Sequence, residues 1–285
     1  MTEQELQAYI AAIRPADEAA MTAARRRQAE LAKPPGSLGK LEDMAVRMAG
    51  VTGQVCPEVK KCRVAVFAAD NGVVAEGVSC APQSVTVQQA VNMTFRKTGM
   101  SAMAAAFGDD VAVVDVGIDG DVPPVGILDR KVRRGTGNIV REDAMTRRQV
   151  LEAMAAGMEQ AALAKADGVT ALGIGEMGIG NTTTSSAVTA VLLGLAIETV
   201  TGRGAGLSNE GLVRKLDAIH RAIDINCPDA SDPMDVLCKL GGFDIAGMAG
   251  IFLGGALYRV PVLIDGLISS VAALIAARLC PNATC

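Results

Sequence analysis

The chain has 285 residues, half of them hydrophobic, with 27 basic and 31 acidic side chains and a formal net charge of −4. This length fits one large domain, or one domain with a small appendage, and the apolar composition excludes a disordered chain. The mild acidity, without Lys/Arg runs interleaved with aromatic residues, argues against a nucleic-acid-binding protein.

The start of the chain and its most apolar segment both argue against export or membrane insertion. The first residues lack the basic and then apolar layout of a signal peptide. Segment 251–279 is interrupted by Arg259, Asp265 and Arg278, so a buried strand and helix are expected there, not a bilayer span. Seven scattered cysteines, no CxxC motif and a single histidine, His220, argue against a zinc site. We expect the cysteines to be small buried side chains of a cytoplasmic protein.

The first part of the chain is predicted to be helical, over residues 3–13, 17–32 and 37–50. These helices are assigned to a small domain, residues 1–55, which precedes an α/β domain over 56–285. Short β-branched runs then alternate with helical segments. The predicted strands are 63–69, 111–116, 169–174 and 260–264, with a weaker one at 197–201. Mostly apolar strands that alternate with helices predict a doubly wound parallel sheet, with ligand sites at the carboxyl ends of its strands.

Capping signals predict three long helices in this α/β part, and segment 117–140 is expected to be an irregular connection. The helices are expected between Thr146 and Gly168, from Ser208 to about Asn226, and from a capping Asp244 to about Tyr258.

Three predicted strands end in a carboxylate that is followed closely by glycine, namely Asp70, Asp115 and Asp265. An aspartate at such a position most often stabilises a loop. Because three of them fall at one edge of a sheet, we expect some of them to line a crevice.

The densest motif runs from Gly173 to Ser186 and reads Gly-Ile-Gly-Glu-Met-Gly-Ile-Gly-Asn-Thr-Thr-Thr-Ser-Ser. It follows an apolar strand and opens into a helix. Glycines allow a ligand to approach the backbone, and amide groups at a helix start suit a phosphate. Glu176 would repel a phosphate, so we expect it to face a polar or cationic part of the ligand beside that group.

The same segment also matches a dinucleotide-binding fingerprint. Gly173, Gly175 and Gly178 fit G-x-G-x-x-G, and Glu198 lies 20 residues beyond the last glycine. An NAD-dependent oxidoreductase is therefore an alternative hypothesis. Against it, Glu176 falls where the backbone should meet a pyrophosphate, and the run of hydroxyl residues is superfluous to that motif.

One predicted helix carries two further candidates. His220 lies in mid-helix, and such a histidine is usually a surface or half-buried side chain. Lys215, about one and a half turns earlier, is either a solvated residue or a cation that reaches the phosphate crevice. The sequence contains no P-loop, H-E-x-x-H or G-x-S-x-G motif.

Long ordered motifs, taken together, resemble the nicotinate-nucleotide–dimethylbenzimidazole phosphoribosyltransferase family. They are Lys33-Pro-Pro-Gly-Ser-Leu-Gly-Lys-Leu-Glu42, Ala68-Ala-Asp-Asn-Gly-Val-Val-Ala-Glu-Gly-Val78, Val85-Thr86 with Gln89 and Asn92-Met93, Asp115-Val-Gly-Ile-Asp119, Gly173-Ile-Gly-Glu-Met-Gly-Ile-Gly-Asn-Thr-Thr183, Lys239-Leu-Gly-Gly-Phe-Asp-Ile-Ala-Gly-Met248 and Leu263-Ile-Asp-Gly266.

The resemblance implies a Rossmann-like parallel sheet with a small helical domain, and a homodimer, with a heterodimer as the alternative. It implies that nicotinate mononucleotide gives its ribose phosphate to dimethylbenzimidazole, or to a similar aromatic acceptor, during cobalamin assembly. The leaving group is already a cationic pyridinium, so we expect neither a metal nor a cofactor. The enzyme must hold a phosphate, align two rings and remove one proton.

The resemblance also implies residue roles. The phosphate would be bound by Gly178, Gly180, Asn181, Thr182 and Thr183, with Lys215 as the candidate cation. Glu176 would face the reacting centre in an auxiliary catalytic role, and the acceptor-base pocket would be lined by Pro82, Gln83, Gln89 and Asp265.

The chain departs from the family pattern at two places. Asp70-Asn71-Gly72 stands where many members have Asp-His-Gly, and the Gly-Glu-Gly-x-Gly-Ala loop that carries the family's general base does not occur in this sequence. The first hypothesis is therefore an active transferase in which Glu176 or a partner chain supplies the base. The second is a chain that binds nicotinate mononucleotide but is catalytically impaired.

Overall fold

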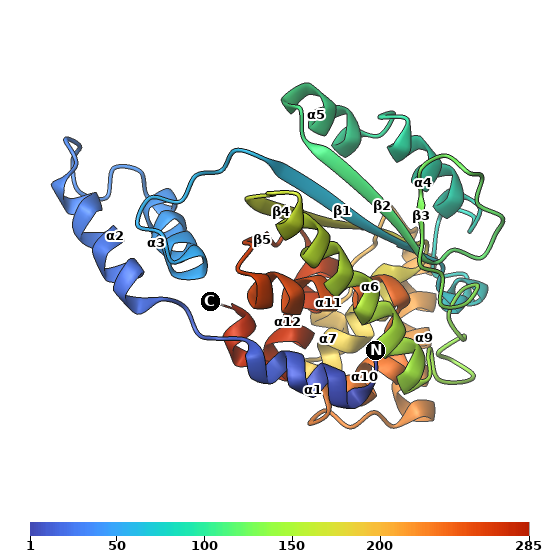
Figure 1. Ribbon diagram of the computed structural model, residues 1–285. Coiled ribbons are helices and arrows are strands. Elements are labelled where there is room, and N and C mark those ends of the chain that lie inside the picture. The colour runs from blue at the N-terminus through green and yellow to red at the C-terminus, as the bar shows by residue number, and fades with distance from the viewer. Residues whose placement is uncertain (285) are drawn as a thin grey trace.

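Five parallel strands form one sheet in the computed structural model, which describes residues 1–284 (Figure 1). The strands are β1 (Cys62–Ala69), β2 (Asp110–Gly117), β3 (Leu128–Asp129), β4 (Ala171–Met177) and β5 (Val262–Leu263), in the order β3-β2-β1-β4-β5. Every neighbouring pair is parallel. The predicted doubly wound α/β class is confirmed.

Helices surround this sheet and precede it. They are α1 (Glu3–Ala12), α2 (Glu18–Glu30), α3 (Lys40–Thr52), α4 (Val85–Thr94), α5 (Gly99–Phe107), α6 (Arg147–Ala166), α7 (Asn181–Leu193), α8 (Ile197–Val200), α9 (Asn209–Asn226), α10 (Pro233–Leu240), α11 (Phe243–Tyr258) and α12 (Leu267–Leu279). Two short 3₁₀ helices, η1 (Gly72–Glu76) and η2 (Pro281–Thr284), complete the described chain.

Both faces of the central strand β1 are buried, as its apolar sequence predicts. Ala65 and Phe67 belong to a large core that includes α6, α11 and α12, whereas Val66 and Ala68 belong to a smaller core under α4. Side chains of a strand alternate between its faces, so this single run supports both layers. The carboxyl ends of β1, β2 and β4 therefore open at one edge, where the candidate site lies.

The N-terminal helices divide between two packing groups. Leu6 of α1 is buried in the main core. By contrast, α2 and α3 pack on each other through a separate cluster of small residues, Ala20, Ala24, Val46 and Ala49. Figure 1 accordingly shows α2 and α3 standing beside the sheet and α1 lying along the main body. A small domain over residues 1–55 remains a prediction.

Several local predictions were wrong. Residues 197–201 were expected as a strand, but Ile197–Val200 form helix α8, where the Thr199 amide and hydroxyl both donate to Ala196 O. Asp244 does not cap α11, because Gly242 is the N-cap and the aspartate binds Asn181 instead. The last strand shrinks to Val262–Leu263 at the sheet edge.

The cysteines are less buried than expected. Cys238 and Cys280 are buried and Cys62 is half-buried, but Cys56, Cys80 and Cys227 are exposed loop or helix-end residues. The same expectation for Cys285 falls outside the described residues.

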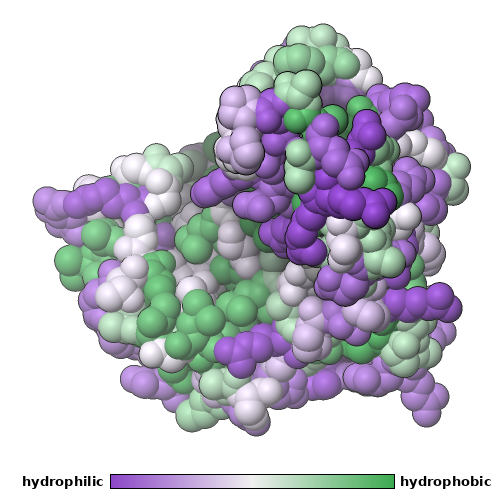
Figure 2. Space-filling model, turned by 90° about the vertical axis from the view of Figure 1, so that its left-hand side faces the viewer, coloured by the Kyte–Doolittle hydropathy of each residue, from purple (hydrophilic) through white to green (hydrophobic). Residues whose placement is uncertain are grey.

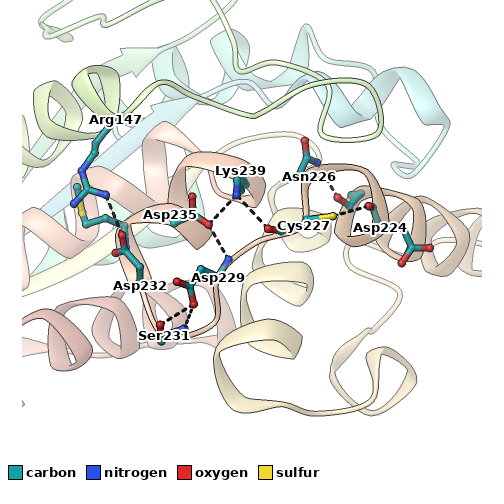
Figure 3. A network of polar contacts seen from close by, with 11 residues as sticks. Arg147, Asp224, Asn226, Cys227, Asp229, Ser231, Asp232, Asp235 and Lys239 are labelled. Atoms are coloured by element: carbon teal, nitrogen blue, oxygen red, sulfur yellow. Dashed lines mark hydrogen bonds and ion pairs between the residues drawn. The ribbon is translucent and has the colours of Figure 1, made fainter.

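A polar network fixes the turn between α9 and α10 (Figure 3). Asp232 caps α10 by accepting from the Met234 amide, and it also pairs with Arg147 of α6 at 3.1 Å. Lys239 pairs with Asp235 at 3.0 Å and donates to the Cys227 carbonyl. This network ties α10 to the start of α6 and the end of α9.

An apolar groove of about 480 Å³ lies between α3, the end of α11 and β5. Its lining includes Met44, Met48, Phe252, Val262 and Leu263. Figure 2 shows hydrophobic side chains gathered around a hollow on this face. Because the starts of β1 and β4 also line it, the groove lies away from the carboxyl edge of the sheet. In the described part of the chain, no helix is long and apolar enough to cross a membrane.

Candidate active site

The loop between β4 and α7 is the centre of the candidate site. Gly180 has φ +92°, a left-handed conformation that favours glycine. A side chain at Gly178 would place its Cβ 2.5 Å from the Ala69 carbonyl oxygen. These two glycines let the backbone turn tightly against the end of β1, so the start of α7 faces the carboxyl edge of the sheet.

A buried hydroxyl fixes this loop to its neighbours. Thr86, on α4, donates from Oγ1 to Asp70 Oδ1 at 2.6 Å and accepts from the Ile179 amide at 3.2 Å. Thr86 and Asp70 are both almost fully buried. The end of β1, helix α4 and the glycine loop are thereby joined by one chain of hydrogen bonds.

Lys215 is the basic group of the site. It is fully buried on α9, and its Nζ donates to Thr182 Oγ1 at 2.7 Å and to the Gly202 carbonyl at 3.1 Å. Burial lowers the pKa of this lysine to about 8. The structure thus places Lys215 against the first turn of α7, as expected for a cation that reaches the glycine loop. The neighbouring Thr183 hydroxyl is buried and has no hydrogen-bond partner in the described residues.

Glu176 lies in the last two residues of β4, beside this loop, and is only half-buried. Its carboxylate accepts a hydrogen bond from the Asn181 amide, and the same Asn181 nitrogen donates to Asp244 Oδ2 at 2.8 Å. Burial, assisted by the negative charge of Asp265, raises the pKa of Glu176. One asparagine therefore joins two carboxyl groups at the base of the loop.

Sequence reasoning missed Asp244 as a member of this site. It is fully buried in the first turn of α11. An aspartate in an otherwise apolar helix, two residues after Gly242, was the available signal. It was interpreted as a helix cap because that role is common for aspartate at a helix start.

The four predicted residues of the acceptor pocket are not joined by one network. Gln83 donates to Asp119 Oδ2 at 3.0 Å, Pro82 is exposed, and Gln89 is half-buried on α4. Asp265 is exposed, and its charge acts on Glu176. Their shared pocket remains a prediction.

The other strand-end aspartates, Asp70 and Asp115, are loop anchors. Asp70 Oδ2 accepts from the Asp119 amide, and Asp115 Oδ1 accepts from the amides of Gly117 and Ile118. Burial raises the pKa of both carboxyls, and Lys131 lies 3.2 Å from Asp115.

The dinucleotide fingerprint fails structurally. Gly173 and Gly175 lie inside strand β4, in register with Val64 and Val66 of β1, so they do not form a loop. Glu198 lies on α8 and contacts His220 on the surface. The surface interpretation of His220 is confirmed, and the residues required for NAD binding are not assembled.

Comparisons with known proteins show the family of this chain. A family model described as "Phosphoribosyltransferase" matches residues 13–285. The nicotinate-nucleotide–dimethylbenzimidazole phosphoribosyltransferase of Acetivibrio thermocellus is 51% identical over 262 residues, which are 92% of this chain and 75% of that protein. Its counterpart from Ruminiclostridium cellulolyticum is 49% identical over 262 residues, covering 92% of this chain and 74% of that protein. The crystal structure of CobT from Thermus thermophilus superposes with a TM-score of 0.88 at 43% identity, covering 92% of this chain and 79% of that one.

The sheet and its glycine loop define a Rossmann-like enzyme of the phosphoribosyltransferase class. More narrowly, the chain belongs to the nicotinate-nucleotide–dimethylbenzimidazole phosphoribosyltransferase family. The comparisons give no support to the hypothesis of a catalytically impaired binding protein.

Proposed function

We propose that this enzyme transfers the ribose phosphate of nicotinate mononucleotide to 5,6-dimethylbenzimidazole, giving α-ribazole 5′-phosphate and nicotinate for cobalamin assembly. Its relatives carry the name of this reaction, and the site has the groups that the reaction requires. The observation that carries the proposal is the buried Lys215, bound to Thr182 at the start of α7 beside the glycine loop.

The chemistry is a displacement at the anomeric carbon of the ribose. The bond from that carbon to the pyridinium nitrogen breaks, and its electron pair neutralises the nicotinate ring. A benzimidazole nitrogen forms the new bond from the opposite side, which inverts the configuration. The second benzimidazole nitrogen then gives up its proton to a base.

Physical arguments support the assignment of the phosphate-binding residues. Gly178 and Gly180 allow a close approach to the backbone, and the positive end of the α7 dipole stabilises an anion there. Asn181, Thr182 and Thr183 form the first turn of that helix. The positive charge of Lys215 adds the electrostatic attraction.

Glu176 has the properties expected of the proton acceptor at the reacting centre. Its raised pKa makes it a better proton acceptor near neutral pH than an ordinary glutamate. We assign to it the role of accepting the proton that leaves the acceptor ring. Gln83, Gln89 and Asp265, with Pro82, are assigned to the acceptor pocket that the family resemblance predicts.

Product formation tests the proposal. Purified enzyme is incubated with nicotinate mononucleotide and 5,6-dimethylbenzimidazole, and we expect α-ribazole 5′-phosphate and nicotinate by mass spectrometry. Glu176→Gln should lower kcat/KM by about 10²-fold or more, since a general base typically contributes about 10²–10⁴-fold. Glu198→Gln is the matched control, because Glu198 pairs with His220 on the surface and should keep full activity when substituted.

The wild-type assay tests the proposed reaction, and the Glu176→Gln assay tests the role of Glu176. Absence of product from the wild-type enzyme would refute the proposed reaction. Full activity of Glu176→Gln would leave the reaction standing and refute the role of Glu176.

We also propose that the enzyme is a homodimer working in the reducing cytoplasm. Exposed apolar side chains that line the groove, including Met44, Leu263 and Ile264, support self-association. The scattered cysteine pattern supports the compartment. Sedimentation equilibrium should give about twice the chain mass of 29.3 kDa, and a monomer mass would contradict the assembly.

A further inference from the structure

The carboxyl groups of Glu176 and Asp244 lie on different elements but share one hydrogen-bond donor. Glu176 is the last residue but one of β4, Asp244 is the second residue of α11, and Asn181 is the first residue of α7. The Asn181 nitrogen donates to both carboxyls. Asp244 Oδ1 also accepts from the Ile245 amide at 3.0 Å.

Backbone encloses Asp244 on two sides. A Cβ at Gly178 would lie 2.8 Å from Asp244 Oδ2, and a Cβ at Gly242 would lie 2.5 Å from Asp244 Oδ1. The same Cβ at Gly242 would lie 2.7 Å from Oδ1 of Asn71, whose buried amide has no hydrogen-bond partner in the described residues. In the described part of the chain, no basic side chain contacts Asp244.

The charged groups that surround this pair are few. The charge of Glu176 acts on Asp244, and that of Asp265, which follows β5, acts on Glu176. At the carboxyl ends of β1 and β2, Asp70 is held by Thr86, and Asp115 is paired with Lys131.

Lys215 on α9 has other hydrogen-bond partners, since it donates to Thr182 and to the Gly202 carbonyl. Neither carboxyl of the pair is therefore neutralised by a basic side chain in residues 1–284.

Two neighbouring carboxyls in a site of low polarity resist ionising together. Consistent with this, burial and the charge of Glu176 raise the pKa of Asp244 to about 7. The Asn181 amide offsets part of the repulsion because it donates to both groups.

We propose that Asp244 is a positioning residue for the transfer reaction: it anchors the side-chain amide of Asn181, and through Asn181 it orients the carboxylate of Glu176. This inference rests on the proposed function, in which Glu176 takes the proton that leaves the acceptor ring. Asp244 itself, fully buried, does not touch the substrates.

Two substitutions should move the titration of Glu176 in the same direction. Asn181→Ala removes the donor that favours the ionised carboxylate, so Glu176 should titrate at higher pH. Asp244→Asn keeps the shape and the bond from the Ile245 amide, but it turns an amide nitrogen toward Asn181, which loses its anchor. Glu176 should then titrate at higher pH, by less than in Asn181→Ala. Because Asp244 acts through Asn181, Asp244→Asn should add no shift to Asn181→Ala, whereas an effect of packing alone would add one.

The shifts are measured on the ligand-free enzyme by carbon-13 NMR titration of labelled glutamate carboxyls, with the Glu176 signal assigned by Glu176→Gln. Asp115→Asn is the control, because Asp115 is a buried strand-end carboxyl that binds the amides after β2 and pairs with Lys131, and it should leave the Glu176 titration unchanged. An unchanged titration in both Asp244→Asn and Asn181→Ala would overturn the inference. If Asp244→Asn does not fold, Asn181→Ala still tests it.

The pH profile of kcat/KM for the acceptor tests whether Asp244 affects turnover. In Asp244→Asn its acidic limb should move to higher pH by the same amount as the NMR titration, and the maximal kcat/KM should fall because Glu176 is no longer held in one orientation. An unmoved limb, with the NMR shift present, would overturn the role of Asp244 in turnover. A wild-type enzyme that forms no product would refute the proposed function. The NMR titration would still show whether Asp244 acts on Glu176 through Asn181.

Discussion

At the scale of single residues, burial determines the charge state of the site. Lys215 is fully buried, and its pKa of about 8 lies close to the working pH of most enzymes. Asp244 is equally buried and has a pKa of about 7. The affinity and the stability of this protein should therefore both depend on pH within the range from about 5 to about 9.5.

The pH dependence of substrate binding tests Lys215. Its ammonium group is charged below pH 8 and loses its charge above it, so the Kd of nicotinate mononucleotide should be constant between pH 7 and 8 and then rise up to about tenfold per unit. Lys215→Met should raise the Kd at pH 7 by about 10- to 100-fold, because a hydrogen bond to a charged group contributes about 1.5–3 kcal/mol. It should also abolish the rise at high pH.

Isothermal titration calorimetry at pH 7, 8, 9 and 9.5 measures both effects. Arg214→Met is the matched control, since Arg214 is the adjacent exposed cation on α9 and should change the Kd less than threefold. Equal effects of the two substitutions would contradict the assignment of Lys215 to the phosphate.

The stability of the fold should fall as the pH rises through the pKa of Asp244. The folded-state pKa is about 7, above the unfolded value of 3.8, so the native state holds this proton more tightly than the unfolded chain does. That contribution is complete below pH 3.8 and is lost as the pH rises through 7. Between pH 5 and 8 the Tm of the wild type should decrease, and the decrease should be smaller in Asp244→Asn.

Calorimetric Tm values at pH 5, 6, 7 and 8 check this prediction. Asp167→Asn is the control: Arg63 lowers the pKa of Asp167, so its contribution is lost only when the pH falls toward that pKa. Its effect on the Tm should be the same at all four pH values. Parallel curves for the wild type and Asp244→Asn would show that the Asp244 proton does not stabilise the native state.

At the scale of elements, glycines allow α6 and α11 to pack backbone against backbone. A Cβ at Gly157 would lie 1.9 Å from the Gly247 carbonyl oxygen, and one at Gly250 would lie 2.0 Å from the Met154 oxygen. No rotation of a side chain relieves such a contact. The helix that carries Asp244 is thereby held close to its neighbour over several turns.

Gly157→Ala should therefore cost at least about 2 kcal/mol of unfolding free energy, as overpacking in cores typically does. Urea unfolding followed by circular dichroism measures the change. Gly99→Ala, in helix α5, has no atom within 4 Å of its new Cβ and should change the free energy by less than about 0.5 kcal/mol. Equal midpoints for the two variants would show that α6 and α11 move apart at little cost.

The elements also show what a single sequence can predict. Strands β1, β2 and β4 are largely apolar runs, so their positions were predicted to within a few residues. Residues 197–200 are β-branched at three of four positions, yet they form a helical turn whose Ile197 is buried in the core. The glycine loop and Lys215 were predictable from local motifs, but the contact of Asp244 with Asn181 spans 63 residues and arises only in the fold.

At the scale of the whole molecule, one side chain connects the α2–α3 pair to the sheet domain. Arg259, which ends α11 with φ +59°, donates to the carbonyl oxygens of Gly50 and Val51 at 3.1 and 3.3 Å, and to that of Pro15 at 3.2 Å. These carbonyls flank α2 and lie in the last turn of α3. Because α2 and α3 have a small core of their own, this guanidinium should govern how often the pair detaches.

Arg259→Gly removes the guanidinium and suits the left-handed backbone at this position. Amide hydrogen exchange followed by mass spectrometry should show α2 and α3 exchanging about tenfold faster, which corresponds to about 1.4 kcal/mol, while β1 and β4 exchange as in the wild type. Arg278→Ala is the control, because Arg278 binds the Leu192 carbonyl and should leave α2 and α3 unaffected. Faster exchange throughout the chain would mean that α2 and α3 unfold only with the sheet, and the separate helical domain predicted over residues 1–55 would then have no independent stability.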